Sequence, residues 1–574
     1  MTTEMRVQTE RVDDIPLLMW QQRVMGIPRI VDEIVQPHGN RNGLSVGWTI
    51  ATWLCYIVSQ ADHRLSYVES WAADHQTTLQ GLLPEKLLAS DFTDDRLGDV
   101  LRYLSDDTAW QAIESEVGKQ IIQVYELPQE RVYTDSTSVS VYHDHEGNPL
   151  MAYGHSKDHR PDLPQFKLML SSLAPFGLPL VTLPVAGNQA DDELYLPVIE
   201  QSRRVLDRRG LLYIGDSKME ALQIRASLVA EGDYYLMPLT SKHAELLDEL
   251  LQPVLNQTQA LTDIYLHPEE SDEEQEPVRA YETVRPQEAV RGGATIAWTE
   301  RVLVVYSPAY AASTRQALLT RLQRAEAELM TLTPPPARGK RQWSELNPLT
   351  AAVEAILKRY RVQGLFTLSY ERRETQRHIR KHKERPARTE TLVRYQLQVA
   401  QDVQAIERLQ ETFGWRLYVT NCPVAQLSVE EAVRAYRQTP IFEHSFSRLK
   451  NRSLGLRPLY LHRHEHIVGL VRLLSLALRI LTLVEFVVRR ELYEQKATLT
   501  GLYEGNPNRA TERPTTERLL RAFQPITLTR ISWAGQQSSH LTPLTALQAC
   551  ILALLGLPES TYTDLAGSTL AISP

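Results

Sequence analysis

The order of strand-like and helix-like segments between residues 131 and 239 constrains the fold most strongly. Apolar and β-branched runs bounded by the turn-rich stretches HDHEGNP and APFG predict strands, and amphipathic runs between later strands predict helices. Strands that alternate with helices in this way predict a mixed α/β sheet with helices packed on it. In chain order, the segments are strands at 131–142, 165–173 and 178–187, a helix at 191–209, a strand at 211–217, a helix at 217–232 and a strand at 233–239.

Two aspartates occupy unusual places in these strands. Asp135 lies inside RVYTDSTSVSVY, and Asp216 follows the strand LLYIG. A carboxylate is a poor strand former and is costly to bury, although a single one is most often a cap or a hydrogen-bond partner. Ligands bind at the carboxyl ends of strands in α/β sheets, and Gly215 allows a substrate backbone to approach closely. If the two strands are neighbours, the carboxylates converge and need a cation, for which Mg²⁺ is the expected ion.

A third acid follows in AYRQTPIFEHSFSRLKN. Tyr436, Glu443 and Lys450 are spaced seven residues apart, which places them on one face if the segment is one helix. On that face Glu443 would reach a metal ion, while Tyr436 and Lys450 would contact DNA phosphates. The alternative is an ordinary amphipathic helix with a half-buried tyrosine.

The region between the second and third acids is rich in charge. It contains the acidic stretch 267–277, the strand-like 295–307, and basic stretches at 337–343 and 370–388. The second basic stretch is sufficient to hold several phosphates, unless it is a solvated helix face with glutamate partners. We expect five regions: a helical N-terminal domain at 1–125 that is a candidate for DNA binding, a catalytic core at 126–240, an insertion at 241–410, the rest of the core at 411–495, and a C-terminal extension at 496–574.

The overall composition is that of a globular protein in a reducing compartment. The formal net charge of −8 argues only mildly against nucleic acid, because the charge is patchy. The three cysteines, Cys55, Cys422 and Cys550, are far apart and indicate no disulfide framework. The N-terminus has no apolar run, so no signal peptide is expected.

Two further features invite other interpretations. The apolar segment 467–488 is long enough for a membrane span, but Arg472, Arg479 and Glu485 interrupt it. We expect a buried core helix with one wet or nucleic-acid-facing edge, and no membrane. The histidines at 143, 145, 155 and 159 and at 462, 464 and 466 lack standard zinc spacing, so a zinc site is disfavoured.

These motifs together resemble the DDE transposases of bacterial insertion sequences, in the group with a Tyr-x2-Arg-x3-Glu-x6-Lys signature. Tyr436, Glu443 and Lys450 match that signature, whereas its arginine falls on Thr439; Arg437 is close by, but on a different helix face. YTDSTSVS, YIGDSKM, GHSKDHRPDLPQFKLML and VAGNQADD are similar to other segments of the family, so the resemblance runs from about 90 to 490.

The resemblance implies a ribonuclease-H-like catalytic domain. It also implies a mostly-β insertion between the second and third acids, a gap of 227 residues (443 − 216). Asp135, Asp216 and Glu443 would hold two Mg²⁺ or Mn²⁺ ions. The enzyme would hydrolyse a phosphodiester at the transposon end, and the exposed 3′-hydroxyl would then attack target DNA, as in cut-and-paste transposition.

The resemblance also implies partners and DNA contacts. The partners would be the terminal inverted repeats and target DNA, bound by a homodimer in a prokaryotic cytoplasm at the nucleoid. Trp298 and Trp343 are candidates to stack on a displaced base, although each is also a candidate core residue. Two alternatives stay open: an inactive, domesticated DNA-binding protein, and another ribonuclease-H-like nuclease. The candidate DNA contacts are Tyr436, Arg437, Lys450, Lys157, Arg160, Trp298 and Trp343.

Overall fold

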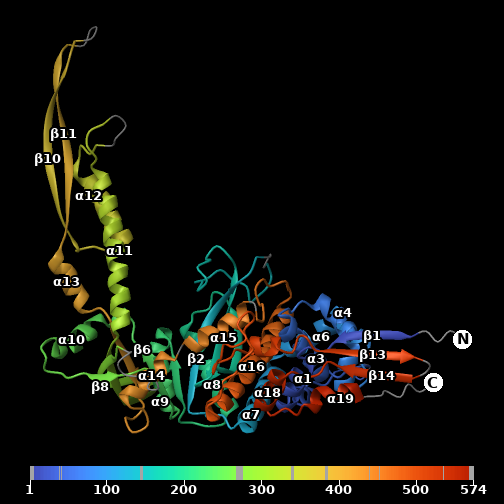
Figure 1. The fold of residues 1–574 in the computed structure, drawn as a ribbon. Coiled ribbons are helices and arrows are strands. Elements are labelled where there is room, and N and C mark those ends of the chain that lie inside the picture. The colour runs from blue at the N-terminus through green and yellow to red at the C-terminus, as the bar shows by residue number, and fades with distance from the viewer. Residues whose placement is uncertain are drawn as a thin grey trace.

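A nine-stranded mixed sheet runs through the middle of the protein, in the order β4-β3-β2-β5-β6-β12-β9-β8-β7 (Figure 1). The computed structural model describes residues 5–37, 39, 42–142, 146–266, 276–337, 342–381, 386–438, 440–451, 453–533 and 536–567. The central strands are β2 (Arg131–Ser140), β3 (Gln165–Leu173), β4 (Leu178–Ala186), β5 (Leu212–Gly215), β6 (Tyr234–Pro238) and β12 (Trp415–Thr420).

The strands β2 to β6 follow the chain order that the sequence predicts and form a mixed sheet. β2, β3 and β4 are joined antiparallel, whereas β5 pairs parallel with β2 and β6 pairs parallel with β5. All nine residues of β3 are buried, because helices cover both faces of the sheet. The mixed α/β prediction is therefore confirmed, and the strand order is consistent with a ribonuclease-H-like core.

Helices from distant parts of the chain cover the two faces. α7 (Asp107–Tyr125), α8 (Tyr195–Leu206) and α16 (His464–Glu494) pack against β4, while α14 (Val429–Arg437) packs on β6 and β8 from the other face. α9 (Leu222–Ala230) packs beside β6, β8 and β9. α15 (Pro440–Lys450) contacts both β2 and α16, which brings the segment of the third acid to the strand of the first.

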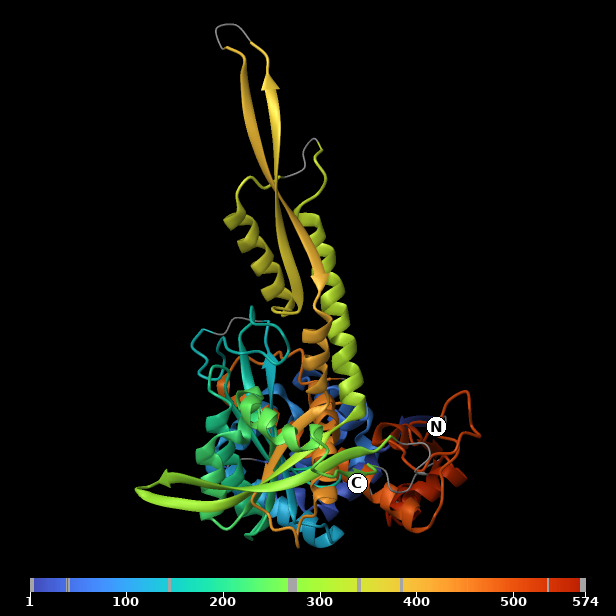
Figure 2. The same cartoon turned by 90° about the vertical axis from the view of Figure 1, so that its left-hand side faces the viewer.

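The region 241–410 is not a separate, mostly-β domain. β9 (Ala294–Tyr306) pairs with β12, and β8 (Val278–Arg291) pairs with β9, so both extend the central sheet. β7 (Thr262–Ile264), which comes after α10 (Ala244–Leu255) in the chain, pairs with β8 and forms the edge of the sheet. What projects is an arm of helices and one two-stranded ribbon around its own apolar core (Figures 1 and 2). The arm comprises α11 (Pro308–Leu332), α12 (Leu346–Tyr360), β10 (Phe366–Ile379), β11 (Arg388–Gln401) and α13 (Val403–Glu411).

The two ends of the chain form one unit. β1 (Arg6–Arg11) pairs with β13 (Thr527–Trp533), which pairs with β14 (Gln536–Leu541), so the expectation that residues 1–125 are all helical is wrong at β1. The N-terminal helices are α1 (Ile15–Val24), α2 (Ile27–Ile34), α3 (Val46–Gln60), α4 (Val68–Asp74), α5 (Gln76–Leu82) and α6 (Asp94–Ser105), and the C-terminal ones are α17 (Thr516–Arg521), α18 (Ala546–Leu554) and α19 (Ser560–Gly567).

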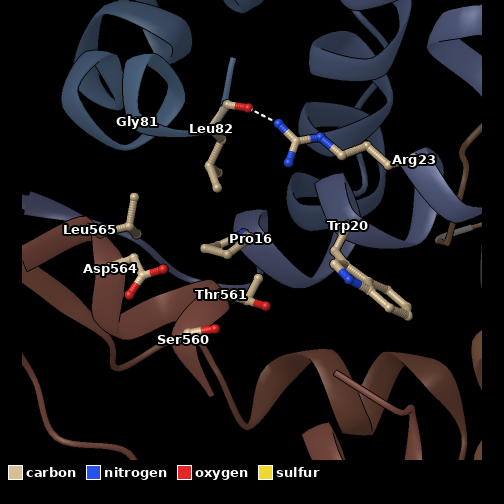
Figure 3. Close-up of a pocket in the computed structure, with 9 residues that line it drawn as sticks. All are labelled: Pro16, Trp20, Arg23, Gly81, Leu82, Ser560, Thr561, Asp564 and Leu565. Atoms are coloured by element: carbon tan, nitrogen blue, oxygen red, sulfur yellow. Dashed lines mark hydrogen bonds between the residues drawn. The ribbon is translucent and has the colours of Figure 1, made fainter. Parts of the chain in front are cut away.

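A crevice marks the line where these two ends meet (Figure 3). Pro16, Trp20 and Arg23 of α1 face Thr561 and Asp564 of α19 across it. The Arg23 guanidinium donates to the Leu82 carbonyl at the end of α5. Residues more than 500 positions apart thus share one core, and the predicted C-terminal extension packs on the predicted N-terminal domain.

α16 is long and apolar enough to cross a membrane, but it is buried inside the protein along the whole apolar window. The expectation of a core helix is confirmed. The expected wet or nucleic-acid-facing edge is wrong, because Arg472 and Arg479 are both buried. Arg479 donates to Glu114 of α7 at 2.8 Å and to the carbonyls of Pro179 and Leu180, and Arg472 donates to Asp107 and to the Leu104 carbonyl.

Candidate active site

Asp135 and Asp216 lie side by side because of how their strands pair. Thr134 of β2 is in register with Gly215 of the parallel strand β5. The next residues, Asp135 and Asp216, therefore lie at the same edge of the sheet. A Cβ on Gly215 would lie 2.5 Å from the Met219 sulfur. The glycine therefore makes room for the turn that follows Asp216, whereas the sequence suggested a substrate backbone there.

The third acid reaches this edge from a different helix than the spacing predicts. α14 ends at Arg437 and α15 begins at Pro440, a residue that disfavours helix immediately before it. Tyr436 therefore belongs to α14, while Glu443 and Lys450 belong to α15, and the prediction of one shared helix face is wrong. Thr439 lies outside the described residues.

All three acids nevertheless line one cavity. It has a volume of about 190 Å³ and is bounded by Tyr133, Thr134, Asp135, Ile214, Gly215, Asp216, Tyr436 and Glu443. The Glu443 side chain is exposed, and the two aspartates are partly buried. Three carboxylates from two strands and one helix thus face the same small volume.

The environment of Asp135 disfavours the charged form of its carboxyl. Burial raises the pKa of the Asp135 carboxyl and the charge of Asp216 raises it further, while the Lys157 ammonium lowers it in part. Asp135 Oδ1 accepts hydrogen bonds from the Ser136 backbone N–H at 2.6 Å and from Lys157 Nζ at 3.3 Å. A divalent cation would relieve the repulsion between the two carboxylates.

Asp216 is held by a residue that the sequence analysis missed. The buried Tyr195 hydroxyl donates to Asp216 Oδ1 at 2.6 Å, and the Lys218 backbone N–H donates to the same oxygen at 2.9 Å. Burial and the charge of Asp216 raise the pKa of Tyr195 far above its usual value, so the hydroxyl stays a donor. Tyr195 is the first residue of α8 and lies three positions after the segment VAGNQADD, and this place is the signal that could have identified it.

The donor set fits a hard divalent cation. Carboxylate oxygens are the ligands that Mg²⁺ and Mn²⁺ prefer. Across the part of the chain that the structure describes, however, no group of three or more His, Cys, Asp or Glu side chains is already arranged to hold an ion. Glu443, which is exposed, would therefore have to approach Asp135 and Asp216 for all three to bind the same site.

Lys450 lies inside the protein and not on a DNA-facing surface. Its buried Nζ donates to Thr137 Oγ1 at 2.9 Å, to the Ser138 carbonyl at 3.2 Å and to Asp158 Oδ1 at 2.9 Å. Lys450 thus ties α15 to β2 and to the connection between β2 and β3. The structure places it as an internal anchor for the helix that carries Glu443.

The other candidate contacts near the acids differ in exposure. Tyr436 packs on Tyr418 with ring centroids 4.4 Å apart, and the Nε and Nη2 atoms of Arg437 are buried without a hydrogen-bond partner among the described residues. Arg160 is partly exposed, pairs with Asp162 at 2.7 Å and lies over the Tyr142 ring.

Neither tryptophan lies beside the acids. Trp298 is half-buried on β9, where its Nε1 donates to the Tyr235 hydroxyl at 2.8 Å. Trp343 is buried in the core of the arm, and its Nε1 donates to the Leu332 carbonyl at 2.8 Å. The core interpretation of Trp343 therefore fits the structure better than base stacking.

Comparison with known proteins gives one family. Residues 127–480, more than half of the chain, match the family model described as the transposase DDE domain. The match begins just before β2 and ends within α16, so it includes all three acids. A search of curated proteins gave no match.

Proposed function

Because the chain belongs to the transposase DDE domain family and is a DDE transposase, we propose that Asp135, Asp216 and Glu443 are its three catalytic acids. The observation that carries this proposal is the single cavity that the three carboxylates line. Asp135 and Asp216 would hold both of two divalent ions, Mg²⁺ or Mn²⁺, and Glu443 would hold one.

The reaction we propose is hydrolysis at the transposon ends followed by strand transfer, as in cut-and-paste transposition. Bound metal ions would polarise the attacking water and stabilise the charge on the transferred phosphate. The 3′-hydroxyl exposed by hydrolysis would then attack a phosphodiester of the target DNA. Tyr195 keeps the Asp216 carboxylate oriented for this, and Lys450 keeps the Glu443 helix against β2.

The ribbon of the arm supports a DNA-binding role. The basic stretch expected as a possible helix face is instead β10 and β11, whose outer residues are exposed on both sides. In register, Arg373 lies opposite Arg394, and Arg377 and Arg388 lie on the same side of the ribbon. Glu371 and Glu390 share this side and pair with Arg373 and Arg388. Four arginines against two glutamates leave this side of the ribbon with a net positive charge, which suits DNA phosphates. Among the β10 and β11 residues that the structure describes, the acidic and basic side chains on the other side of this stretch are Arg372 and Glu374, which pair with each other.

We assign the arginine side of the ribbon to DNA phosphates. A two-stranded ribbon can enter the major groove, and it is marginally stable by itself. The terminal inverted repeats and the target DNA are the proposed partners, a homodimer the proposed synaptic form, and the nucleoid of a prokaryotic cytoplasm the proposed place of action.

The first experiment uses the DNA ends that flank the gene in its own genome. These ends are incubated with purified protein in Mg²⁺, in Mn²⁺ and in EDTA, beside the Asp216→Ala variant and a control, Asp192→Ala, an exposed acid outside the cavity. We expect metal-dependent nicks that Asp216→Ala abolishes and the control retains, with DNA binding unchanged in both.

The outcomes separate the three hypotheses. Cleavage by Asp216→Ala would refute the proposed site. Tight binding without nicking in either metal would favour an inactive, domesticated DNA-binding protein. Nicking without any strand-transfer product would favour another ribonuclease-H-like nuclease.

A further inference from the structure

A lysine side chain already lies against the first acid. Lys157 lies in the connection between β2 and β3, and its Nζ donates to the Ser136 carbonyl at 2.6 Å and to Asp135 Oδ1 at 3.3 Å. The side chain keeps about a third of its surface exposed, at 31%. The ammonium is thus held beside the carboxylate and is also reachable from solvent.

We propose that Lys157 is a built-in counter-ion of Asp135, which a divalent cation displaces when it binds and which is thereby released toward the DNA. This inference rests on the proposed function, because it takes Asp135 as a metal ligand. It differs from a plain phosphate contact, because it makes the lysine a competitor of the metal in the DNA-free enzyme.

The backbone of the connection is fixed independently of the ammonium. The Lys157 backbone N–H donates to Ser138 Oγ at 2.9 Å. The next residue, Asp158, accepts from Lys450 Nζ at 2.9 Å and from Arg457 Nη1 at 2.8 Å. The Lys157 side chain can therefore leave Asp135 without any movement of the loop.

The side-chain chemistry favours release over permanent pairing. A lysine ammonium is a compact charge on a flexible four-carbon stem, so it can turn toward another anion. A partly exposed ion pair contributes little binding energy, and a divalent ion held by two carboxylates replaces it readily. The ammonium also accounts for how Asp135 and Asp216 coexist before metal binds.

The test measures Mn²⁺ binding to the DNA-free full chain by titration calorimetry. We expect Lys157→Met to bind Mn²⁺ about threefold to tenfold more tightly than the wild type, since a partly exposed ion pair no longer competes. Asp135→Asn should lose this binding. Lys119→Met, which removes an exposed lysine paired with Glu116 outside the cavity, is the matched control and should bind Mn²⁺ as the wild type does.

A thermal-shift series gives a second readout. In EDTA, Lys157→Met should melt below the wild type, because Asp135 has lost its counter-ion, and Mn²⁺ should raise its melting temperature by more than it raises that of the wild type. Lys157→Arg keeps the charge and should not bind Mn²⁺ more tightly than the wild type. If Lys157→Met folds only with Mn²⁺ present, that also supports the inference.

Equal or weaker Mn²⁺ affinity in Lys157→Met would overturn the inference, as would absence of Mn²⁺ binding by every variant. The result is independent of DNA cleavage. Tighter Mn²⁺ binding without any nicking of transposon ends would uphold the counter-ion and refute the proposed reaction. Metal-dependent nicking with unchanged Mn²⁺ affinity in Lys157→Met would uphold the proposed reaction and refute the counter-ion role of Lys157.

Discussion

The Lys450 ammonium lies 2.9 Å from the Asp158 carboxylate in a largely buried ion pair that joins the helix of the third acid to the connection after the strand of the first. Lys450 also donates to Thr137 and Ser138 of β2. In transposases with the Tyr-x2-Arg-x3-Glu-x6-Lys signature, the resemblance implied a phosphate contact for this lysine. In the structure, the three hydrogen bonds that the Lys450 ammonium donates all go to other groups of the protein.

Lys450→Met should therefore act on stability and cleavage but not on DNA binding. Breaking a buried ion pair leaves Asp158 partly uncompensated, which lowers the free energy of unfolding by about 3 kcal/mol. Urea denaturation and a salt titration of DNA affinity measure the two effects, with the exposed Lys119→Met as control. A shallower salt dependence in Lys450→Met would show that this ammonium contacts phosphate after all.

Tyr195→Phe should lower cleavage while the fold stays intact. The change removes the hydroxyl that donates to Asp216 and keeps the ring, and loss of such a partner typically costs 10- to 100-fold in metal affinity or activity. Single-turnover cleavage at several Mg²⁺ concentrations measures it. The matched control is Tyr213→Phe, a buried tyrosine of β5 that donates to the Ile199 carbonyl instead. Equal effects of the two changes would contradict a positioning role for Tyr195.

The double change Arg373→Gln with Arg394→Gln should weaken DNA binding through electrostatics. If both arginines contact phosphates, the slope of log affinity against log salt should become shallower by about 2. Arg372→Gln, on the other side of the same ribbon, should leave the slope nearly unchanged. A slope that responds equally to both changes would mean that the two sides of the ribbon are not distinguished by DNA.

Arg479→Met should destabilise the protein severely. The Arg479–Glu114 pair is fully buried between α16 and α7, and removal of one partner leaves an uncompensated charge that costs about 3–5 kcal/mol. Chemical denaturation of the full chain measures this loss. The double variant Glu114→Met with Arg479→Met should recover much of it, and failure to recover would show that the pair is needed for more than mutual charge compensation.

The buried Asp14 should make stability depend on pH. Burial raises the pKa of this carboxyl from 3.8 to about 7. The folded chain therefore holds this proton more tightly than the unfolded chain, and the free energy of unfolding falls as the pH rises from about 4 to 7, by on the order of 4 kcal/mol. Asp14→Asn should remove this dependence, as measured by urea denaturation at pH 5 and pH 8. The exposed Asp95→Asn should keep it.

The sequence by itself determined the local elements and indicated Asp135 and Asp216 as candidate acids. Strand alternation and turn residues placed β2 to β6 within a few residues, because these patterns reflect burial on a pleated sheet. Asp135 and Asp216 stood out since a carboxylate in an apolar strand has few satisfactory environments. The long apolar segment of α16 predicted a core helix, because its interrupting charged residues argue against a membrane span.

Only the tertiary structure decided which distant groups meet. Tyr195 reaches Asp216, Lys157 reaches Asp135 and Arg479 reaches Glu114 through side-chain contacts that no periodicity encodes. A spacing of seven predicts one helix face only if the helix is continuous, and the chain starts a new helix at Pro440. Strand pairing likewise decided that β8 and β9 extend the central sheet, because register and partners depend on residues far away in the sequence.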